Sequence, residues 1–171
     1  MTSAILSYLI FAVPALIILA AVYDMFTMTI PNAISLALLA LFVVIAPFVA
    51  PDWTTPLMHL GAGAIVLAIG IGLFALGWVG GGDVKLAAAT VLWIGFGGMI
   101  EYLFVAALAG GALTLAILAL RRLPLPEFAM SWGWLDRLHD SRNGVPYGIA
   151  LAIAAIVVLP TTPLWLGAVS A

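Results

Sequence analysis

The sequence predicts an all-α fold, a polytopic membrane helix bundle of about six transmembrane helices, formed by a single membrane-embedded domain over residues 1–171. Three observations predict it. Of the residues, 66% are hydrophobic and 7% are charged, with a mean hydropathy of +1.31, whereas a soluble domain carries roughly 25% charged residues. The apolar residues form runs long enough to cross a hydrocarbon core. All five Lys and Arg residues fall on alternate connections between these runs.

The apolar runs define the expected spans. Because a hydrocarbon core takes about 20 apolar residues per helix, we expect spans at residues 4–22, 33–50, 57–78, 84–98, 99–120 and 146–168. Pro14 should kink the first span, since proline removes a helical hydrogen bond. We interpret this span as retained, because no Lys or Arg precedes it and it is longer than the apolar region of a usual signal peptide. The small residues Ala20 and Ala21 leave cleavage open as an alternative.

The positions of the cations predict the orientation. Residues 23–32, 79–85 and 121–145 connect spans on one side of the membrane, and this side holds all the cations: Lys85, Arg121, Arg122, Arg137 and Arg142. The other side holds 51–56, 95–99 and both termini. Cytoplasmic loops carry an excess of Lys and Arg, so we expect the first side to be cytoplasmic and the termini to lie outside.

The longest connection carries an amphipathic pattern. Pro124 and Pro126 should end the fifth helix. Between Glu127 and His139 the apolar residues Phe128, Trp132, Leu135 and Leu138 recur near one face of a helix. This spacing predicts an interfacial helix lying on the inner leaflet, which serves either as an anchor or as a lid over a substrate.

Composition excludes several kinds of site. The chain has no cysteine, which excludes disulfides, thiolate metal sites and cysteine nucleophiles. It has no basic cluster suited to nucleic acid. The two histidines, His59 and His139, are far apart in the sequence, so we expect no metal and no cofactor.

Two of the seven acidic residues fall where the topology brings them together. Asp24 and Asp83 end the first and third spans, which run in the same direction, so both carboxylates lie at the cytoplasmic face. A shielded pair of this kind suits an aspartic peptidase, in which one carboxylate activates water and the other donates a proton to the scissile peptide. Gly80, Gly81 and Gly82 would let a substrate backbone approach Asp83 without a side-chain clash. The alternative is that each aspartate is a solvated helix end and the glycines are a plain turn.

These residues carry a resemblance. Gly80-Gly81-Gly82-Asp83 matches the Gly-x-Gly-Asp signature of intramembrane aspartyl proteases. Asp24 followed by Ile30-Pro31-Asn32, then Gly-Gly-Gly-Asp-Val-Lys, resembles the type IV prepilin peptidase family, most closely the short forms that serve Flp (tight-adherence) pili. Pro146-Tyr147-Gly148 at the start of the last span is similar to a further family motif.

The resemblance implies an activity, removal of the leader from prepilins or pseudopilins after a glycine at the cytoplasmic face of the bacterial inner membrane. It implies that Asp24 and Asp83 are the catalytic pair, and that Lys85 contacts substrate or phospholipid, unless Lys85 is only an interfacial anchor. Two departures are visible. Residues 25–29 carry no cation, and the chain lacks the cysteine-bearing insertion of longer relatives, so we expect no methyltransferase activity. The implied partners are a prepilin helix and membrane lipid, with a homodimer left open.

Three other functions fit part of the pattern. The chain could be an intramembrane protease for other substrates, although the Ile30-Pro31-Asn32 element favours prepilins. It could be a proton- or cation-coupled small transporter that uses Asp24 and Asp83, but a relay usually spreads polar groups through the membrane depth. A non-enzymatic assembly scaffold would tolerate Asp→Asn changes at both positions.

Overall fold

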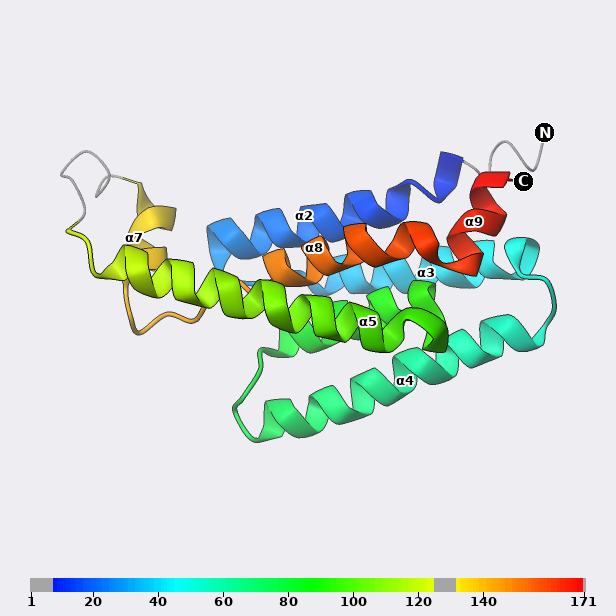
Figure 1. Ribbon diagram of the computed structural model, residues 1–171, viewed down its shortest axis with the longest axis horizontal. Helices are drawn as coiled ribbons and strands as arrows, with labels where there is room; N and C mark the ends of the chain where they lie inside the picture. Colours follow the sequence, from blue (N-terminus) through cyan, green and yellow to red (C-terminus); the bar gives the residue numbers. More distant parts are fainter. Residues whose placement is uncertain (1–7, 125–131, 171) are drawn as a thin grey trace.

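The computed structural model describes residues 8–124 and 132–170, of which 82% are helical and none lie in strands. The elements in order are α2 (Ala12–Thr27), α3 (Asn32–Val49), α4 (Thr54–Ala75), α5 (Gly81–Arg121), α7 (Gly133–His139), α8 (Gly148–Val158), η1 (Leu159–Thr161) and α9 (Pro163–Ser170). The all-α prediction is therefore confirmed for this part of the chain. The long helices run roughly along one axis, and the start of α2 lies at the same end as α9 (Figure 1).

The expected second and third spans correspond to α3 and α4, whose bounds shift by at most three residues. The first span differs more. Helix α2 begins at Ala12 after a break at residues 10–11, so Pro14 lies in its first turn and not within a kinked helix. The expected start, residues 4–7, lies outside the described residues. Helix α2 also continues to Thr27, which places Asp24 inside a helix and not in the connection 23–32 that we expected.

The expected fourth and fifth spans form one element, α5, which turns back on itself at Gly95 (Figure 1). Gly95 has φ 71° and ψ −177°, a conformation that residues with a Cβ rarely adopt. We call residues 81–94 the first arm and residues 96–121 the second arm. The predicted connection of residues 95–99 is thus reduced to a single glycine, and helical structure resumes at once.

A buried histidine from α4 supports this turn. The ring of His59 lies so close to Gly95 that a Cβ there would sit 2.5 Å from Nε2. Its Nδ1 donates a 2.7 Å hydrogen bond to the carbonyl of Leu92, one of the carbonyls near the break. A backbone acceptor in an apolar interior needs such a partner. His59 therefore has a structural role that connects α4 to the turn in α5.

The last expected span, 146–168, is not one straight helix. Helix α8 ends in the 3₁₀ turn η1, and α9 continues at an angle of 66°. Pro160 and Pro163 account for the bend, because neither can donate a helical hydrogen bond.

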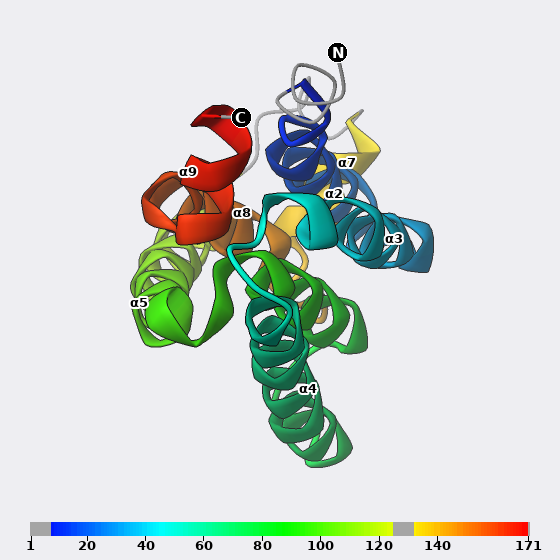
Figure 2. The ribbon, with the colours of Figure 1, turned by 90° about the vertical axis from the view of Figure 1, so that its right-hand side faces the viewer.

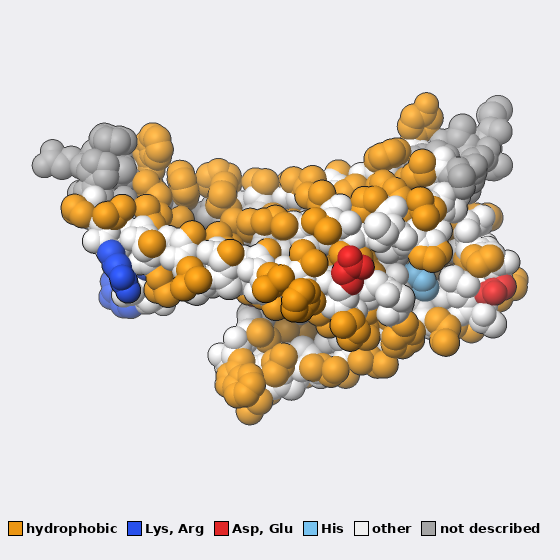
Figure 3. All heavy atoms as spheres, viewed as in Figure 1, with side chains coloured by type: hydrophobic (Ala, Val, Ile, Leu, Met, Phe, Trp, Pro, Cys, Tyr) orange, Lys and Arg blue, Asp and Glu red, His pale blue; other side chains and the backbone are white. Residues whose placement is uncertain are grey.

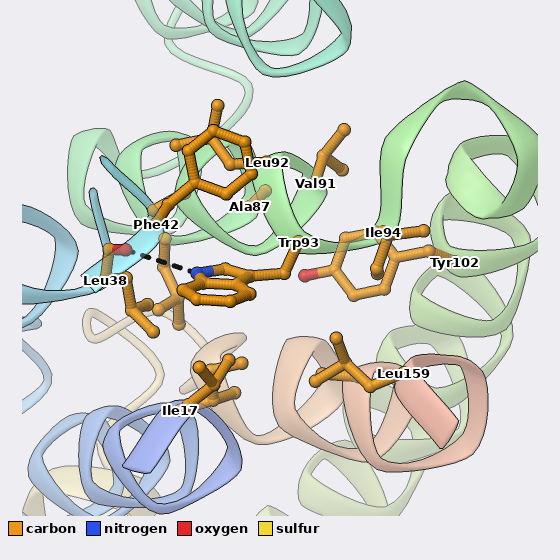
Figure 4. Close-up of a cluster of buried hydrophobic side chains, with 14 of the residues drawn as sticks. Ile17, Leu38, Phe42, Ala87, Val91, Leu92, Trp93, Ile94, Tyr102 and Leu159 are labelled. Carbon is orange, nitrogen blue, oxygen red and sulfur yellow. Dashed lines mark hydrogen bonds between the residues drawn. The ribbon is translucent and has the colours of Figure 1, made fainter. Parts of the chain in front are cut away.

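The buried core forms where the first arm of α5 meets α2, α3, α8 and η1 (Figure 4). Trp93 lies at its centre, donates a 3.2 Å hydrogen bond from Nε1 to the carbonyl of Leu38, and meets Phe42 edge to face. Helix α4 packs on the same arm through glycines and otherwise stands away from the bundle (Figure 2).

Three helices in the described part, α3, α4 and α5, are long and apolar enough to span a membrane, or four spans if the bent pair of α8 and α9 counts as one. The expected number of about six is not confirmed: α2 is too short for that criterion, and α5 is counted once although it turns back. The outer surface suits lipid, because large apolar side chains such as Leu115 (70% exposed) and Ile100 (69%) point outward. Hydrophobic side chains cover most of the visible face, with Lys and Arg gathered at one end (Figure 3).

The connection after α5 docks onto the end of α2. Helix α7 is shorter than the predicted amphipathic helix, and Glu127 and Phe128 lie outside the described residues. Arg137 donates a 2.6 Å hydrogen bond to the carbonyl of Phe26, whose ring meets Trp134 edge to face. Arg121 holds the loop through bonds to the carbonyls of Leu138, Asn143 and Gly144. Helix α7 therefore contacts Phe26, which lies two residues after Asp24 in the sequence.

Candidate active site

Asp24 is held at the end of α2 through both its backbone and its side chain. The residue is only 5% exposed. Its carbonyl accepts a 2.8 Å hydrogen bond from the N–H of Met28, which closes the helix in a left-handed conformation with φ 56°. Its Oδ2 accepts a 2.7 Å hydrogen bond from the backbone N–H of Gly148. A carboxylate with a backbone donor at this distance has a fixed orientation.

Gly148 can make this bond because it has no side chain. A Cβ at position 148 would lie 2.9 Å from Oδ2 of Asp24 and 3.2 Å from Cδ1 of Ile30. Gly148 is also the first residue of α8, so its N–H has no intrahelical acceptor and is free to bind an anion. The end of α2 and the beginning of α8 thus form a closely packed junction around Asp24.

Asp83 lies in the first turn of α5, not in the connection 79–85 that we expected. A carboxylate is favourable there because the N-terminal end of a helix carries partial positive charge. Its side chain turns back towards Gly80, where a Cβ would lie 2.6 Å from Oδ2. Asp83 is partly buried and lies close enough to Asp24 for the two carboxylates to interact electrostatically.

Ile30 lies between Gly82 and Gly148, which are neighbours of the two aspartates. Its Cβ would lie 3.2 Å from a Cβ on Gly82, the residue before Asp83, and its Cδ1 packs near Gly148, the partner of Asp24. Two positions distant in the sequence therefore meet around one side chain. The remaining glycine of this run, Gly81, faces away from this junction: a Cβ there would lie 3.3 Å from the ring of Phe74.

A second link joins the same two segments. Lys85 donates a 2.9 Å hydrogen bond from Nζ to Oδ1 of Asn32. Pro31 adopts an extended conformation and Asn32 is the first residue of α3, although the Asn32 side chain does not cap that helix. Lys85 and Asn32 thus connect the start of α5 to the start of α3, beside Ile30.

The Pro146-Tyr147-Gly148 segment divides its contacts between two neighbours. Gly148 faces Asp24, as described. Tyr147 faces the second arm of α5, where its hydroxyl donates a 3.1 Å hydrogen bond to the carbonyl of Ala106 and its ring covers Gly110. A Cβ on Gly110 would collide with this ring. Pro146 is buried, so we interpret Pro146 and Tyr147 as anchors that set the position of Gly148.

Within the described residues, no group of three His, Asp or Glu side chains is placed to hold a metal ion. Two carboxylates and a backbone donor can bind a water and a peptide carbonyl, and this arrangement supports general acid–base chemistry.

Comparison with known proteins identifies the family. The model of the type IV leader peptidase family matches residues 10–115, more than half of the chain. The chain belongs to this family. Membership implies that the chain is a protease that acts on substrates with a leader peptide. The predicted resemblance to this family is confirmed. The match includes Asp24, Ile30-Pro31-Asn32 and Gly80–Lys85, but it ends before Pro146-Tyr147-Gly148. Comparisons with curated proteins and with solved structures gave no significant match.

Sequence reasoning missed part of the site of this leader peptidase. Gly148 was expected near the site, but its hydrogen bond to Asp24 was not foreseen, and neither was the contact of Gly110 with Tyr147. A glycine pair in an apolar run, Gly110 and Gly111, was the only signal for that contact.

Proposed function

We propose that this peptidase is an aspartic endopeptidase of the membrane, in which Asp24 and Asp83 are the catalytic residues. One observation carries the proposal. The fold brings the end of α2, the start of α5 and the start of α8 together, so that Gly148, the partner of Asp24, and Gly82, the residue before Asp83, both lie against Ile30.

The mechanism follows from the difference between the two carboxylates. Two acids that interact electrostatically do not both ionise readily, so in this mechanism the pair shares one proton and titrates as a unit. The ionised member removes a proton from water, which attacks the carbonyl carbon of the scissile peptide bond. The protonated member donates a hydrogen bond to the carbonyl oxygen. Collapse of the tetrahedral intermediate breaks the C–N bond as a proton passes to the leaving amine.

The orientation of Asp24 fits the part of the base. Its Oδ2 is engaged by the Gly148 N–H, which stabilises the ionised form and leaves Oδ1 for water. Asp83, at a more open position with Gly80 and Gly82 beside it, suits the acid that contacts the substrate carbonyl. Substitution of Gly82 by a larger residue would crowd both Ile30 and the approaching substrate.

We further propose that the site faces the cytoplasm of the bacterial inner membrane and that the chain crosses the membrane about six times. The cations support this orientation, because all five lie in or beside the connections at the end of the bundle that holds the aspartates, and cytoplasmic loops carry an excess of Lys and Arg. The two arms of α5 would count as separate crossings, each running in the opposite direction.

The substrates would be Flp-type prepilins or pseudopilins, cut after a glycine. Such precursors carry a short cationic leader followed by an apolar helix, as the family resemblance implies. The apolar helix would enter the bilayer beside the bundle while the leader stays in water, which would bring the scissile bond to the depth of Asp24 and Asp83. We propose peptidase activity alone, without methyl transfer.

The decisive experiment is cleavage of a Flp-type prepilin by the purified protein in liposomes. The variants are Asp24→Asn and Asp83→Asn, with Asp52→Asn as the matched control, because Asp52 accepts hydrogen bonds from Thr54 and Thr55 at the far end of α4. We expect both active-site variants to lose at least about a hundredfold in rate, since general acid–base groups contribute about 10²–10⁴-fold each. Substantial cleavage by either variant would remove that aspartate from the mechanism.

The same preparation separates the proposal from transport. A folded wild-type protein that cleaves no prepilin in several lipids, but carries a proton flux abolished by the two substitutions, would replace the peptidase mechanism with a relay. Cleavage by the wild type and by Asp52→Asn only would support the aspartic mechanism.

A further inference from the structure

Two buried hydroxyls lie between the two arms of α5. Thr90 in the first arm and Tyr102 in the second arm are both 0% exposed. The Tyr102 hydroxyl points away from the second arm, towards Trp93 of the first arm (Figure 4), and Tyr102 lies close enough to Thr90 for the two side chains to interact. Neither hydroxyl has a hydrogen-bond partner of acceptable geometry among the described residues.

This pair needs a further partner. An unpaired hydroxyl is costly in an apolar interior, and a bond between Thr90 and Tyr102 would use one proton and leave the other without an acceptor. The side chains that surround Tyr102 in the core, such as Ile94 and Leu159, are apolar (Figure 4). Water is small enough to serve, because buried waters bind otherwise unsatisfied polar groups with about three hydrogen bonds each.

The pair lies on the face of the first arm that carries Asp83. Asp83, Ala87 and Thr90 are spaced i, i+4 and i+7, so they share one face of the helix. Asp83 and Thr90 are about 10 Å apart along the helix axis, and only the small side chain of Ala87 lies between them on this face. Tyr102 extends into this stretch, since it also interacts electrostatically with Asp83. Polar groups therefore lead from the buried pair to the carboxylate.

We propose that Thr90 and Tyr102 bind a buried water molecule, and that this water is the inner end of a short hydrogen-bonded chain of waters that reaches Asp83. Tyr147 borders the same stretch, because it interacts electrostatically with both Asp83 and Tyr102. The Tyr147 hydroxyl donates its proton to a carbonyl of the second arm, so its oxygen is left to accept a bond from the chain.

The chain would hold one carboxyl oxygen of Asp83, much as the Gly148 N–H holds Oδ2 of Asp24. Thr90 and Tyr102 are thus positioning residues, which act on Asp83 through water and contact no substrate. This role rests on the proposed aspartic mechanism, whereas the water site itself does not.

Stability separates a bound water from two unpaired hydroxyls. Removal of an unpaired hydroxyl raises the thermal midpoint, whereas removal of a water ligand lowers it. We expect Tyr102→Phe and Thr90→Val each to lower the midpoint of the full chain in detergent by about 2–4 °C. The double variant should lose less than the sum, because both hydroxyls bind one water. Thr114→Val, whose hydroxyl bonds to the carbonyl of Gly110, is the control, and its loss should add to that of Tyr102→Phe.

X-ray hydroxyl-radical labelling reads the water directly. Radicals formed from a bound water oxidise the side chain that touches it, so a fully buried tyrosine is labelled only where water lies against it. We expect Tyr102 to be oxidised in the wild type, to be protected in Thr90→Val and to be labelled again in Thr90→Ser, which keeps the hydroxyl. Phe42, 1% exposed in the same core, is the internal control and should be protected in all three proteins.

Cleavage of a prepilin in liposomes tests the effect on Asp83. Tyr102→Phe should lower kcat about tenfold, as expected from one lost hydrogen bond near a reacting group. KM should not change, because no contact with substrate is removed. Tyr8→Phe removes a phenol that is 79% exposed and should cleave as the wild type does.

The outcomes distinguish the water site from the proposed function. Higher midpoints for Tyr102→Phe and Thr90→Val, or protection of Tyr102 in the wild type, would overturn the water site. Labelling that depends on Thr90, combined with an unchanged kcat in Tyr102→Phe, would overturn its role at Asp83. A wild type that cleaves no prepilin would refute the proposed function, while the labelling and the midpoints would still decide whether the water is bound.

Discussion

Replacing Gly148 with alanine tests whether cleavage depends on the contact between α8 and Asp24. A Cβ on Gly148 would lie 2.9 Å from Oδ2 and 3.0 Å from Cβ of Asp24. Ordinary van der Waals contacts of a Cβ begin at 3.4 Å, so the carboxylate or the start of α8 must move by about 0.5 Å. Either movement lengthens the 2.7 Å hydrogen bond from the Gly148 N–H.

The expected loss of rate follows from this displacement. A misplacement of about 1 Å at reacting groups costs roughly a hundredfold, so half of it corresponds to about tenfold. The weakened bond to a charged acceptor would add to this, because such bonds contribute about 1.5–3 kcal/mol. We therefore expect Gly148→Ala to cleave about 10 to 100 times more slowly than the wild type, with a loss of stability of about 1–3 kcal/mol from overpacking.

The assay is single-turnover cleavage of a prepilin in liposomes, with helix content and thermal midpoint measured on the same sample. Gly111→Ala is the control, since a Cβ there meets nothing within 4 Å and the change is otherwise the same. If folded Gly148→Ala cleaves at the rate of Gly111→Ala, then the backbone donor of α8 does not position Asp24, and the argument from the junction is wrong.

Three further substitutions probe the supports of the site. Gly82→Val should reduce cleavage more than tenfold in the same assay, because even its Cβ would lie 3.2 Å from the neighbouring isoleucine; full activity would show that the glycine is not required for approach. Gly95→Ala should lower the thermal midpoint, because the backbone is left-handed there and the Cβ would meet His59 at 2.5 Å; the strain costs about 1–3 kcal/mol, and an unchanged midpoint would contradict it. Gly110→Ala should displace the ring of Tyr147 and reduce stability more than Tyr147→Phe, which loses one hydrogen bond worth about 1 kcal/mol; the reverse order in thermal unfolding would show that the ring does not pack on the glycine.

The sequence predicted the helical class and most of the apolar segments because hydropathy reports burial in lipid directly. Helices α3 and α4 lie within three residues of their predicted spans. The helix ends were predicted less well. Asp24 and Asp83 were placed in connections because they are charged, whereas both lie inside helices. Hydropathy marks where a helix leaves hydrocarbon, but backbone hydrogen bonding continues the helix into the interface.

The turn in α5 shows what composition cannot resolve. Three glycines, Gly95, Gly97 and Gly98, were equal candidates for the break between two spans. The structure uses Gly95 alone, and the reason lies on another helix, because His59 supplies the hydrogen bond to Leu92. A lone histidine in an apolar run gives no sign of this partner. The sequence likewise gives no sign of why position 148 is a glycine, because the reason is the close approach of the Asp24 side chain from another helix.

The geometry of the candidate site depends mainly on glycines, which have no side chain. Asp24 approaches Gly148, Asp83 folds over Gly80, and Gly82 leaves room for Ile30. Each glycine lets the backbone come close to a carboxylate or to Ile30. The positions of the two aspartates are therefore set by closely packed helix ends and not by a network of polar side chains. Within a bilayer this is an efficient solution, because every added polar side chain would need its own partner. It also makes the site sensitive to single methyl groups, and the glycine substitutions above therefore test the architecture as directly as changes to the aspartates test the chemistry.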